Sequence, residues 1–209
     1  MHEELFVQMR ELEDKHWWFL GRRRIVESVI ERLGLEPTSS ILDAGCGGGR
    51  NLVWLVGQGA RPYAVDRDPE RIAGLLDSGF DTDRASVAEL DHLPFDEASF
   101  DVVLCNAVLH FARDPGHFEA MVRELGRVLA PGGLFFARLA SSIGIEDDIH
   151  PLGSRRYTLP DGSDRFLVDV SLLEEATRWL EAELVDPIKT TNVGGLRCMT
   201  TWVARRRGA

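Results

Sequence analysis

The sequence predicts an α/β fold in which a mostly parallel sheet carries helices on both faces. Short apolar segments alternate with amphipathic helical segments from residue 40 onward, a pattern typical of parallel strands joined by helical crossovers. A glycine-rich turn separates the first strand from its helix, and an acidic residue ends the second strand. The length of 209 residues fits one domain with a full-sized core.

Two features precede the glycine-rich turn, in residues 1–39. Apolar residues recur at helical spacing in segment 25–33 and predict a helix. The upstream segment 16–24, HWWFLGRRR, contains Trp18 and Arg22 as candidate ligand contacts. Arginine binds carboxylates and aromatic rings exclude water. The alternative is that the aromatic side chains only dock this segment on the core.

Segment 40–51, SILDAGCGGGRN, contains a strand, a glycine-dense turn and the start of a helix. Glycine permits close backbone approach, and the N-terminus of a helix favours anionic ligand groups, so the segment predicts a nucleotide-type site. Arg50 stands where a dinucleotide fingerprint requires glycine, and the lysine of a Walker A loop is missing. The candidate ligand residues of this turn are Asp43, Gly45, Cys46, Gly47 and Gly49.

The second strand, predicted over residues 61–66, ends in Asp66. A carboxylate at this place accepts both hydroxyl groups of a ribose in dinucleotide-binding folds. Asp66 and the adjacent Arg67 are therefore candidate cofactor contacts, with a solvated acid as the alternative. Asp68 and Pro69 have the residue types of a helix N-cap and first helical position.

A third strand is predicted near residues 85–87, and a fourth over residues 99–106. The fourth is nearly all apolar, as expected of a strand buried on both faces. Its end should lie at the carboxyl edge of the sheet, where open α/β sheets bind ligands, which makes Asn106 a candidate contact. His110 follows as a candidate general base because imidazole titrates near neutrality. Packing of the loop is the alternative role for His110.

A helix with one apolar face runs from Asp114 to Leu129, and a fifth strand follows over residues 134–139. Residues 141–170 show little periodicity and are long for a plain connection, which predicts a lid or acceptor-binding insert. Three arginines in this insert suit an acidic acceptor: Arg155, Arg156 and Arg165.

The last part of the chain, residues 171–209, contains a predicted helix and two closing strands. The pattern Ser171-x-x-Glu174 predicts a capping box at the start of the helix. The two strands are predicted near residues 183–191 and 196–204 as an antiparallel pair.

Four motifs occur in an order that resembles the class I S-adenosylmethionine-dependent methyltransferases, of the methyltransferase type 11-like kind. They are the glycine turn, Asp66, Leu93-Pro94-Phe95 before Phe100-Asp101-Val102-Val103, and Arg127-Val128-Leu129-x-Pro131-Gly132-Gly133. The segment HWWFLGRR is similar to the N-terminal cap of one uncharacterised subgroup. The resemblance implies a Rossmann-like sheet of seven strands, mostly parallel with the last antiparallel. It also implies one domain over 1–209: a helical cap (1–39), a cofactor-binding core (40–140), the insert (141–170) and the closing segment (171–209).

The resemblance implies S-adenosylmethionine as cofactor and S-adenosylhomocysteine as product. The glycine turn would hold the amino-acid end of the cofactor, and Asp66 would bind its ribose. Glu89 falls where many family members have an aspartate bonded to the adenine amino group, with the Leu90 N–H available to a ring nitrogen. Asp91 is the competing candidate for that role.

The expected activity is methyl transfer to a small-molecule acceptor. The alternatives are a protein methyltransferase or a non-catalytic S-adenosylmethionine-binding regulatory module. A net charge of −10 argues against nucleic acid as partner. The motif Asn/Asp-Pro-Pro-Tyr does not follow the fourth strand, because Asn106 precedes Ala107 and Val108. Methylation of amino groups on DNA bases or glutamine is therefore disfavoured.

Composition and histidine spacing predict no metal site, because the six histidines form no cluster with metal-ligand spacing. The three cysteines show no disulfide framework, which favours free thiols in a reducing compartment. Cys46 and Cys105 end neighbouring strands, so a thiol relay is an alternative to simple packing. The chain shows neither a signal peptide nor a stretch of about 20 apolar residues, so a cytoplasmic protein without a membrane partner is expected. The oligomeric state stays open.

Overall fold

A computed structural model describes Ser28 and residues 39–208. The chain divides into two units between Pro37 and Thr38, and the fold described below is that of the second unit. The predicted helical cap, with Trp18 and Arg22, falls on the N-terminal residues outside the described part, and its role stays a prediction.

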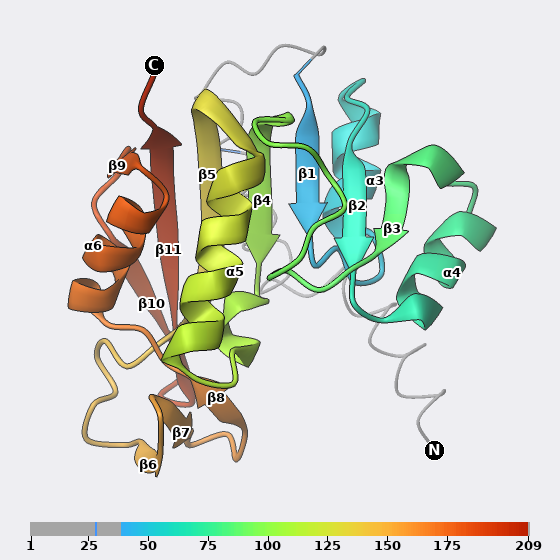
Figure 1. Ribbon diagram of the computed structural model, residues 1–209. Coiled ribbons are helices and arrows are strands. Elements are labelled where there is room, and N and C mark those ends of the chain that lie inside the picture. The colour runs from blue at the N-terminus through green and yellow to red at the C-terminus, as the bar shows by residue number, and fades with distance from the viewer. Residues whose placement is uncertain (1–27, 29–38, 209) are drawn as a thin grey trace. The chain divides into compact units, whose positions relative to one another are not determined.

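The second unit is built around one mixed sheet (Figure 1). Its strands are β1 (Ile41–Ala44), β2 (Tyr63–Asp66), β3 (Ala85–Val87), β4 (Phe100–Asn106), β5 (Leu129–Ser141), β9 (Ala182–Leu184), β10 (Lys189–Val193) and β11 (Arg197–Arg206). The order is β10-β11-β5-β4-β1-β2-β3, and β9 also pairs with β11. Strands β1 to β5 pair in parallel, whereas β11 is antiparallel to each of its partners. The predicted Rossmann-like sheet is confirmed, and β9 adds a strand to the seven expected.

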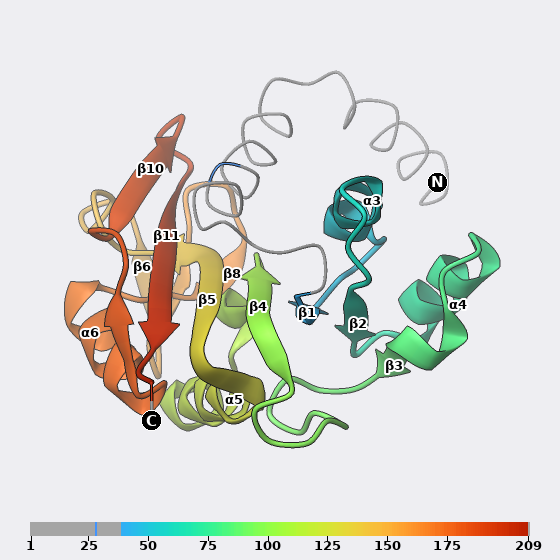
Figure 2. The same ribbon diagram turned by 90° about the horizontal axis from the view of Figure 1, so that it is seen from above.

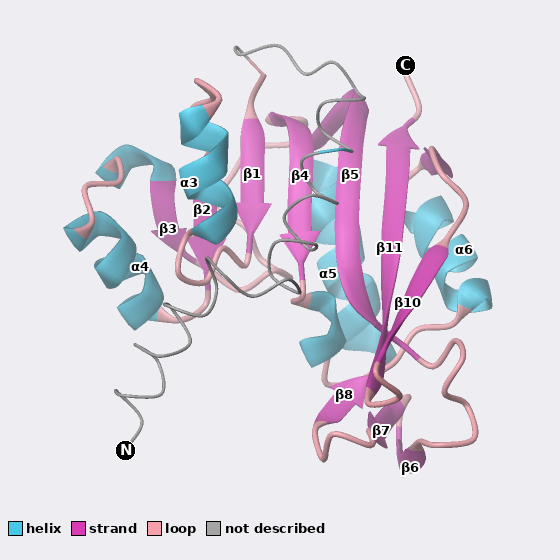
Figure 3. Cartoon of the chain, turned by 180° about the vertical axis from the view of Figure 1, so that it is seen from behind, coloured by secondary structure: helices cyan, strands magenta, loops and turns pink. Residues whose placement is uncertain are grey.

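Helices cover both faces of this sheet, as predicted. They are α3 (Arg50–Gly57), α4 (Pro69–Asp77), α5 (Pro115–Val128) and α6 (Val170–Trp179), with short 3-10 turns η1 (Thr82–Arg84) and η2 (Leu109–Phe111). Helices α5 and α6 lie on one face, and α3 lies on the other (Figures 2 and 3). Helix α4 packs beside β2 and the edge strand β3. None of the helices in the described part is long and apolar enough to cross a membrane.

The helix starts follow simple capping chemistry. Asp68 accepts a hydrogen bond from a backbone N–H of the following first turn, as predicted, and Asp114 caps α5 in the same way. The capping box predicted at Ser171 is wrong. Asp169 caps α6 by accepting from the Leu172 N–H at 2.8 Å, so the helix begins earlier and Ser171 lies inside its first turn.

Two predicted strand boundaries also differ. The strand expected near residues 183–191 is divided into β9 and β10, with Pro187, which has no N–H to donate to a ladder, between them. Strand β5 begins at Leu129 rather than residue 134. A register shift in its pairing with β4 accommodates the added residues Pro131, Gly132 and Gly133.

The predicted insert contains a second, antiparallel sheet rather than an irregular loop. Its strands are β6 (His150–Gly153), β7 (Arg156–Thr158) and β8 (Asp164–Phe166), in that order. Strand β8 contacts the turn η2 and the end of β5. The insert therefore lies at the end of the main sheet toward which β1, β2 and β4 point (Figure 1).

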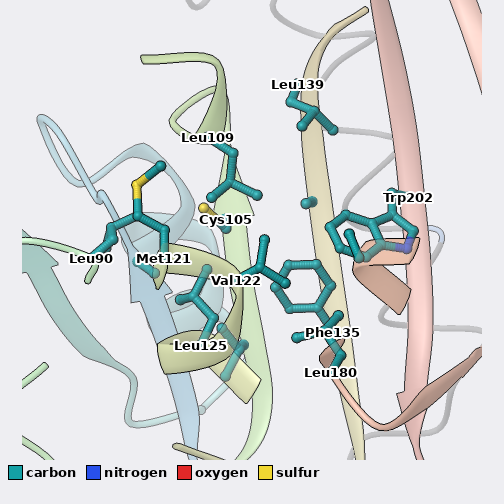
Figure 4. Close-up of a cluster of buried hydrophobic side chains, with 14 of the residues drawn as sticks. Leu90, Cys105, Leu109, Met121, Val122, Leu125, Phe135, Leu139, Leu180 and Trp202 are labelled. Atoms are coloured by element: carbon teal, nitrogen blue, oxygen red, sulfur yellow. The ribbon is translucent and has the colours of Figure 1, made fainter. Parts of the chain in front are cut away.

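The main core fills the space between the sheet and α5 (Figure 4). Val122 and Leu125 of α5 are fully buried there, together with Phe135 of β5. The Phe135 and Trp202 rings meet edge to face with centroids 4.8 Å apart. Burial of each such side chain contributes roughly 1.5–3 kcal/mol, which holds the strand ends in fixed register.

Candidate active site

The glycine turn after β1 is tied to the neighbouring strand by backbone hydrogen bonds. The N–H groups of Gly45 and Cys46 both donate to the Val65 carbonyl, at 2.8 and 2.9 Å. Gly45, Gly47 and Gly49 have φ angles of 79°, 55° and 79°. These left-handed angles favour glycine and explain why the turn is rich in it.

The three glycines have different surroundings. A Cβ at Gly45 would lie 2.4 Å from Val108 Cγ2, and one at Gly49 would lie 2.7 Å from Leu75 Cδ1. Among the described residues, no atom lies within 4 Å of the Cβ position at Gly47. A side chain at Gly45 would thus meet Val108 and one at Gly49 would displace the end of Leu75, whereas Gly47 leaves space among these residues for a ligand.

Asp66 joins the end of β2 to the glycine turn. Its Oδ2 accepts from the Gly47 N–H at 2.8 Å, and its Oδ1 accepts from the Asp68 N–H at 3.0 Å. A carboxylate offers about four acceptor positions, so further positions remain for ligand hydroxyl groups. Arg67 beside it is exposed. Asp43, 1% exposed, accepts from Asn51 Nδ2 at 3.0 Å.

The two acids considered for adenine binding, Glu89 and Asp91, lie in the segment after β3 and differ in their contacts. Asp91 is engaged with the start of α5, lying 3.5 Å from His117 Nε2 and 3.8 Å from Arg113 Nη2. Glu89 is exposed and forms no ion pair within residues 39–208. Leu90 is 5% exposed and packs in the core. The arrangement favours Glu89 over Asp91 as the acid that faces a ligand.

Glu124 and Arg127 of α5 hold this segment through charged hydrogen bonds that were not predicted from the sequence. We call these two residues the charged clasp. Glu124 Oε1 accepts from the Leu93 N–H at 2.7 Å, and Arg127 Nη2 donates to the Leu93 carbonyl at 3.3 Å. Arg127 also forms two hydrogen bonds with Glu124, and these lower the pKa of the Glu124 carboxyl group. The spacing of Glu124 and Arg127, one helical turn apart, was the available signal.

The end of β4 lies against the glycine turn through the Gly45–Val108 contact. The side-chain oxygen of Asn106 is buried and accepts no hydrogen bond from the described residues. Ala107 has φ 65°, a left-handed angle that costs about 1 kcal/mol or more for a residue with a Cβ. Its N–H donates to the Arg138 carbonyl at 2.7 Å, which holds it in place.

His110 is buried, 7% exposed, and its Nδ1 accepts from the Ala140 N–H at 3.2 Å. In the neutral ring Nε2 then carries the hydrogen. Burial, followed by the positive charges of Arg165, Arg197 and Arg138, lowers the pKa of His110 to about 3. The neutral ring offers a donor toward any ligand at Nε2, so the geometry favours hydrogen-bond donation. The role of general base stays a prediction.

The two cysteines at the strand ends are buried thiols. Burial, with the nearby charges of Asp43 and Asp66, raises the pKa of Cys46 to about 12. Burial also raises the pKa of Cys105 well above its ordinary value. Both stay protonated at neutral pH and are poor nucleophiles, which favours packing over a thiol relay. Residues 39–208 contain no group of three or more side chains arranged for metal binding.

Comparison with known proteins matches residues 42–137 to the family model described as "Methyltransferase domain". The chain is 31% identical over 160 residues to the uncharacterized methyltransferase YodH of Bacillus subtilis, covering 73% of this chain and 61% of YodH. It is 30% identical over 152 residues to the ubiquinone biosynthesis O-methyltransferase of Escherichia coli, covering 66% of this chain and 61% of that enzyme. The matched region thus spans less than two thirds of the length of these relatives.

Solved structures share the fold. The 1,6-didemethyltoxoflavin-N1-methyltransferase of Burkholderia thailandensis, with bound S-adenosylhomocysteine, superposes with a TM-score of 0.69 at 23% identity. That superposition covers 98% of this chain and 86% of the other. The family match covers the same strands and turn that form the carboxyl edge described above. The matched domain, these relatives and the shared fold together support a class I S-adenosylmethionine-dependent methyltransferase family for this chain.

Proposed function

We propose that this protein transfers a methyl group from S-adenosylmethionine to a small-molecule acceptor. The observation that carries the proposal is the bond between the glycine turn and the second-strand acid, Gly47 N–H to Asp66 at 2.8 Å. This bond joins two of the motifs that resemble the family, which supports a single site at the carboxyl edge. Asn106 ends β4, and Glu89 follows the end of β3 by two residues.

The residues present fit the cofactor of this family. The open space at Gly47 accommodates a ligand against the backbone. Asp66 keeps acceptor positions for the two ribose hydroxyl groups. The buried Asn106 oxygen, without a donor among the described residues, supplies a further acceptor. These groups suit a ligand that is rich in hydroxyl and amino donors, which S-adenosylmethionine is.

When bound, the cofactor supplies a methyl group already activated by a positively charged sulfur. The protein's task is then to hold donor and acceptor in line and to exclude water. Asp66 and the glycine turn would fix the cofactor, and Glu89 with the Leu90 N–H would hold its adenine. Asp43 would organise the amino-acid end. His110 would position the acceptor through its Nε2 hydrogen, unless it acts as the general base predicted from the sequence.

A small-molecule acceptor is supported by the names of relatives, which include a ubiquinone biosynthesis and a didemethyltoxoflavin methyltransferase. The chain's own acidity, net charge −10, supports the expectation that nucleic acid is not the acceptor. The three buried free cysteines support the cytoplasmic location that the sequence predicts, since free thiols persist in reducing compartments.

Two measurements test this function. Isothermal titration with S-adenosylmethionine and, separately, NAD should give heat only with the former. Release of S-adenosylhomocysteine is then followed against a panel of small molecules and against a peptide library. Turnover with a small molecule supports the proposal. Turnover with peptides alone favours a protein methyltransferase, and tight cofactor binding without turnover favours a regulatory module.

A further inference from the structure

Three arginines from separate elements act electrostatically on His110: Arg138 in β5, Arg165 in β8 and Arg197 at the start of β11. We call these three residues the guanidinium cluster. All three are near enough for their positive charges to depress the pKa of His110. Arg138 is 4% exposed, so this charge lies inside the protein. Like charges gathered in a partly buried place repel one another, which favours a negatively charged partner.

Arg197 of the guanidinium cluster has an acidic partner. Asp161 Oδ2 lies 2.5 Å from Arg197 Nη2 and satisfies that guanidinium. Asp169 is bonded to Arg155 at 2.6 Å, so this arginine of the insert already has an anionic partner. Arg155 and Arg165, both predicted to suit an acidic acceptor, therefore differ in their partners.

Arg165 differs from its neighbours. Within residues 39–208 it forms no ion pair, and its Nη1 donates only to the Asp164 carbonyl, at 2.7 Å. Burial, followed by the charge of Arg197, lowers the pKa of Arg165, and the charges of Asp161 and Asp164 partly offset this. Its guanidinium lies 4.9 Å from the centre of the Phe111 ring. This cation–π contact orients the guanidinium while leaving N–H groups for a planar anion.

The guanidinium cluster adjoins the proposed transfer site. Phe111 and His110 belong to η2, which begins three residues after Asn106 at the end of β4. The His110 and Phe111 rings lie with centroids 4.7 Å apart, and β8 packs on this turn. Figure 3 shows β8 at the end of the sheet toward which the arrows of β1, β2 and β4 point. Arg165 is therefore placed for an acceptor rather than for the adenosine part of the cofactor.

Resting on the proposed function, we propose that the acceptor is a small organic acid whose carboxylate binds the guanidinium cluster, with Arg165 as the main contact. The planar fork of an arginine pairs with both oxygens of a carboxylate. His110 adds a donor through Nε2. An anion there offsets the mutual repulsion of the three arginines. The inference concerns recognition of the acceptor, and the methylated atom is a separate matter.

The experiment uses the full chain saturated with S-adenosylhomocysteine. Succinate, glutarate and tricarballylate are titrated by calorimetry, each against its uncharged amide. The acids should bind and the amides should not. Arg165→Gln should weaken binding of the acids about 10- to 100-fold, because a bidentate charged contact is lost. Arg178→Gln, at an exposed position on α6, removes the same charge and should leave binding unchanged.

Arg165→Lys keeps the positive charge but loses the planar guanidinium that pairs with both carboxylate oxygens. It replaces the glutamine variant in the test if that variant does not fold, and it should retain only part of the affinity for the acids. Thermal unfolding and S-adenosylmethionine affinity are measured for every variant. The proposal is overturned if no acid binds better than its amide, if inorganic phosphate binds better than every acid, or if Arg165→Gln and Arg178→Gln behave alike. Absence of S-adenosylmethionine binding by the unmodified chain would instead overturn the proposed function. Cofactor binding without acid binding overturns only this inference.

Discussion

The glycine-rich edge of the main sheet and the guanidinium cluster beside the insert are assembled in different ways. At the edge, the contacting groups are close in sequence or are backbone atoms, as in the bond from the Gly47 N–H to Asp66. In the guanidinium cluster, the side chains come from positions 138, 165 and 197, on three strands. A site like the glycine-rich edge can be predicted from a short sequence motif. A site like the guanidinium cluster forms only after the insert and β11 have packed.

The largest effect is expected at the glycine-rich edge, where Gly45 lies against Val108. Gly45→Ala should reduce the free energy of unfolding by about 2–5 kcal/mol, from the left-handed φ and the clash with Val108. Gly59→Ala is the matched control, since Gly59 has φ 83° and nothing within 4 Å of its added Cβ. It should lose about 1–2 kcal/mol. Urea unfolding measures both, and equal losses would show that the Val108 contact is unimportant.

At the glycine-rich edge, Asp66→Ala should weaken S-adenosylmethionine binding by about 2–3 kcal/mol, because charged hydrogen bonds are lost. Asp66→Asn keeps one acceptor oxygen and should lose less. Asp77→Ala removes an exposed carboxylate of α4 and is the control for net charge. Calorimetric titration gives the three affinities. Unchanged affinity of Asp66→Ala would mean that the ribose site is elsewhere.

At the guanidinium cluster, stability should depend on pH through His110. Its pKa is lowered to about 3 in the folded protein, below the ordinary value of about 6.5 expected in the unfolded chain. Between these values the unfolded state binds the proton and the folded state does not, so stability falls as pH decreases. The loss from pH 6.5 to 5 is expected to be about 2 kcal/mol. The free energy of unfolding of the unmodified chain and of His110→Gln is measured by chemical unfolding across this pH range. If it changes with pH equally in both proteins, the prediction is contradicted.

The smallest effect tests the start of α6, next to the insert. Asp169→Ala should reduce the free energy of unfolding by about 1 kcal/mol, because the cap of the helix and the pair with Arg155 are lost. Ser171→Ala, at the cap that the sequence predicts, should change it by less than about 0.5 kcal/mol. Thermal and urea unfolding of the two variants compare the caps directly. A larger loss for Ser171→Ala would restore the predicted capping box.

Much of the fold is predictable from local pattern. Buried parallel strands read as apolar runs, and Asp68 and Asp114 mark helix starts by capping chemistry alone. The errors occur where packing decides between local alternatives. Asp169 and Ser171 are both good caps, and the helix takes the aspartate. Pro187 lies between β9 and β10, but the prediction placed one continuous strand near residues 183–191 and so missed this interruption.

The candidate site divides in the same way. Asp43, the glycine turn and Asp66 were predicted as cofactor contacts from motif and spacing, and the structure joins Gly47 to Asp66 by a hydrogen bond; their binding role stays a prediction. The resemblance favoured Glu89 over Asp91 for the adenine, and the contacts of Asp91 with the start of α5 support the same choice. The Glu124–Arg127 clasp on Leu93 was missed because its partners lie about 30 positions apart.

The sequence by itself determined the fold class and the resemblance to a methyltransferase family, because both depend on short-range periodicity and on the glycine turn. The tertiary structure decided which charges face one another. His110 has the residue type of a base, yet its burial and the arginines around it keep its pKa far below neutrality. Desolvation and the field of distant side chains are properties of the packed chain, and no local pattern of residues reports them.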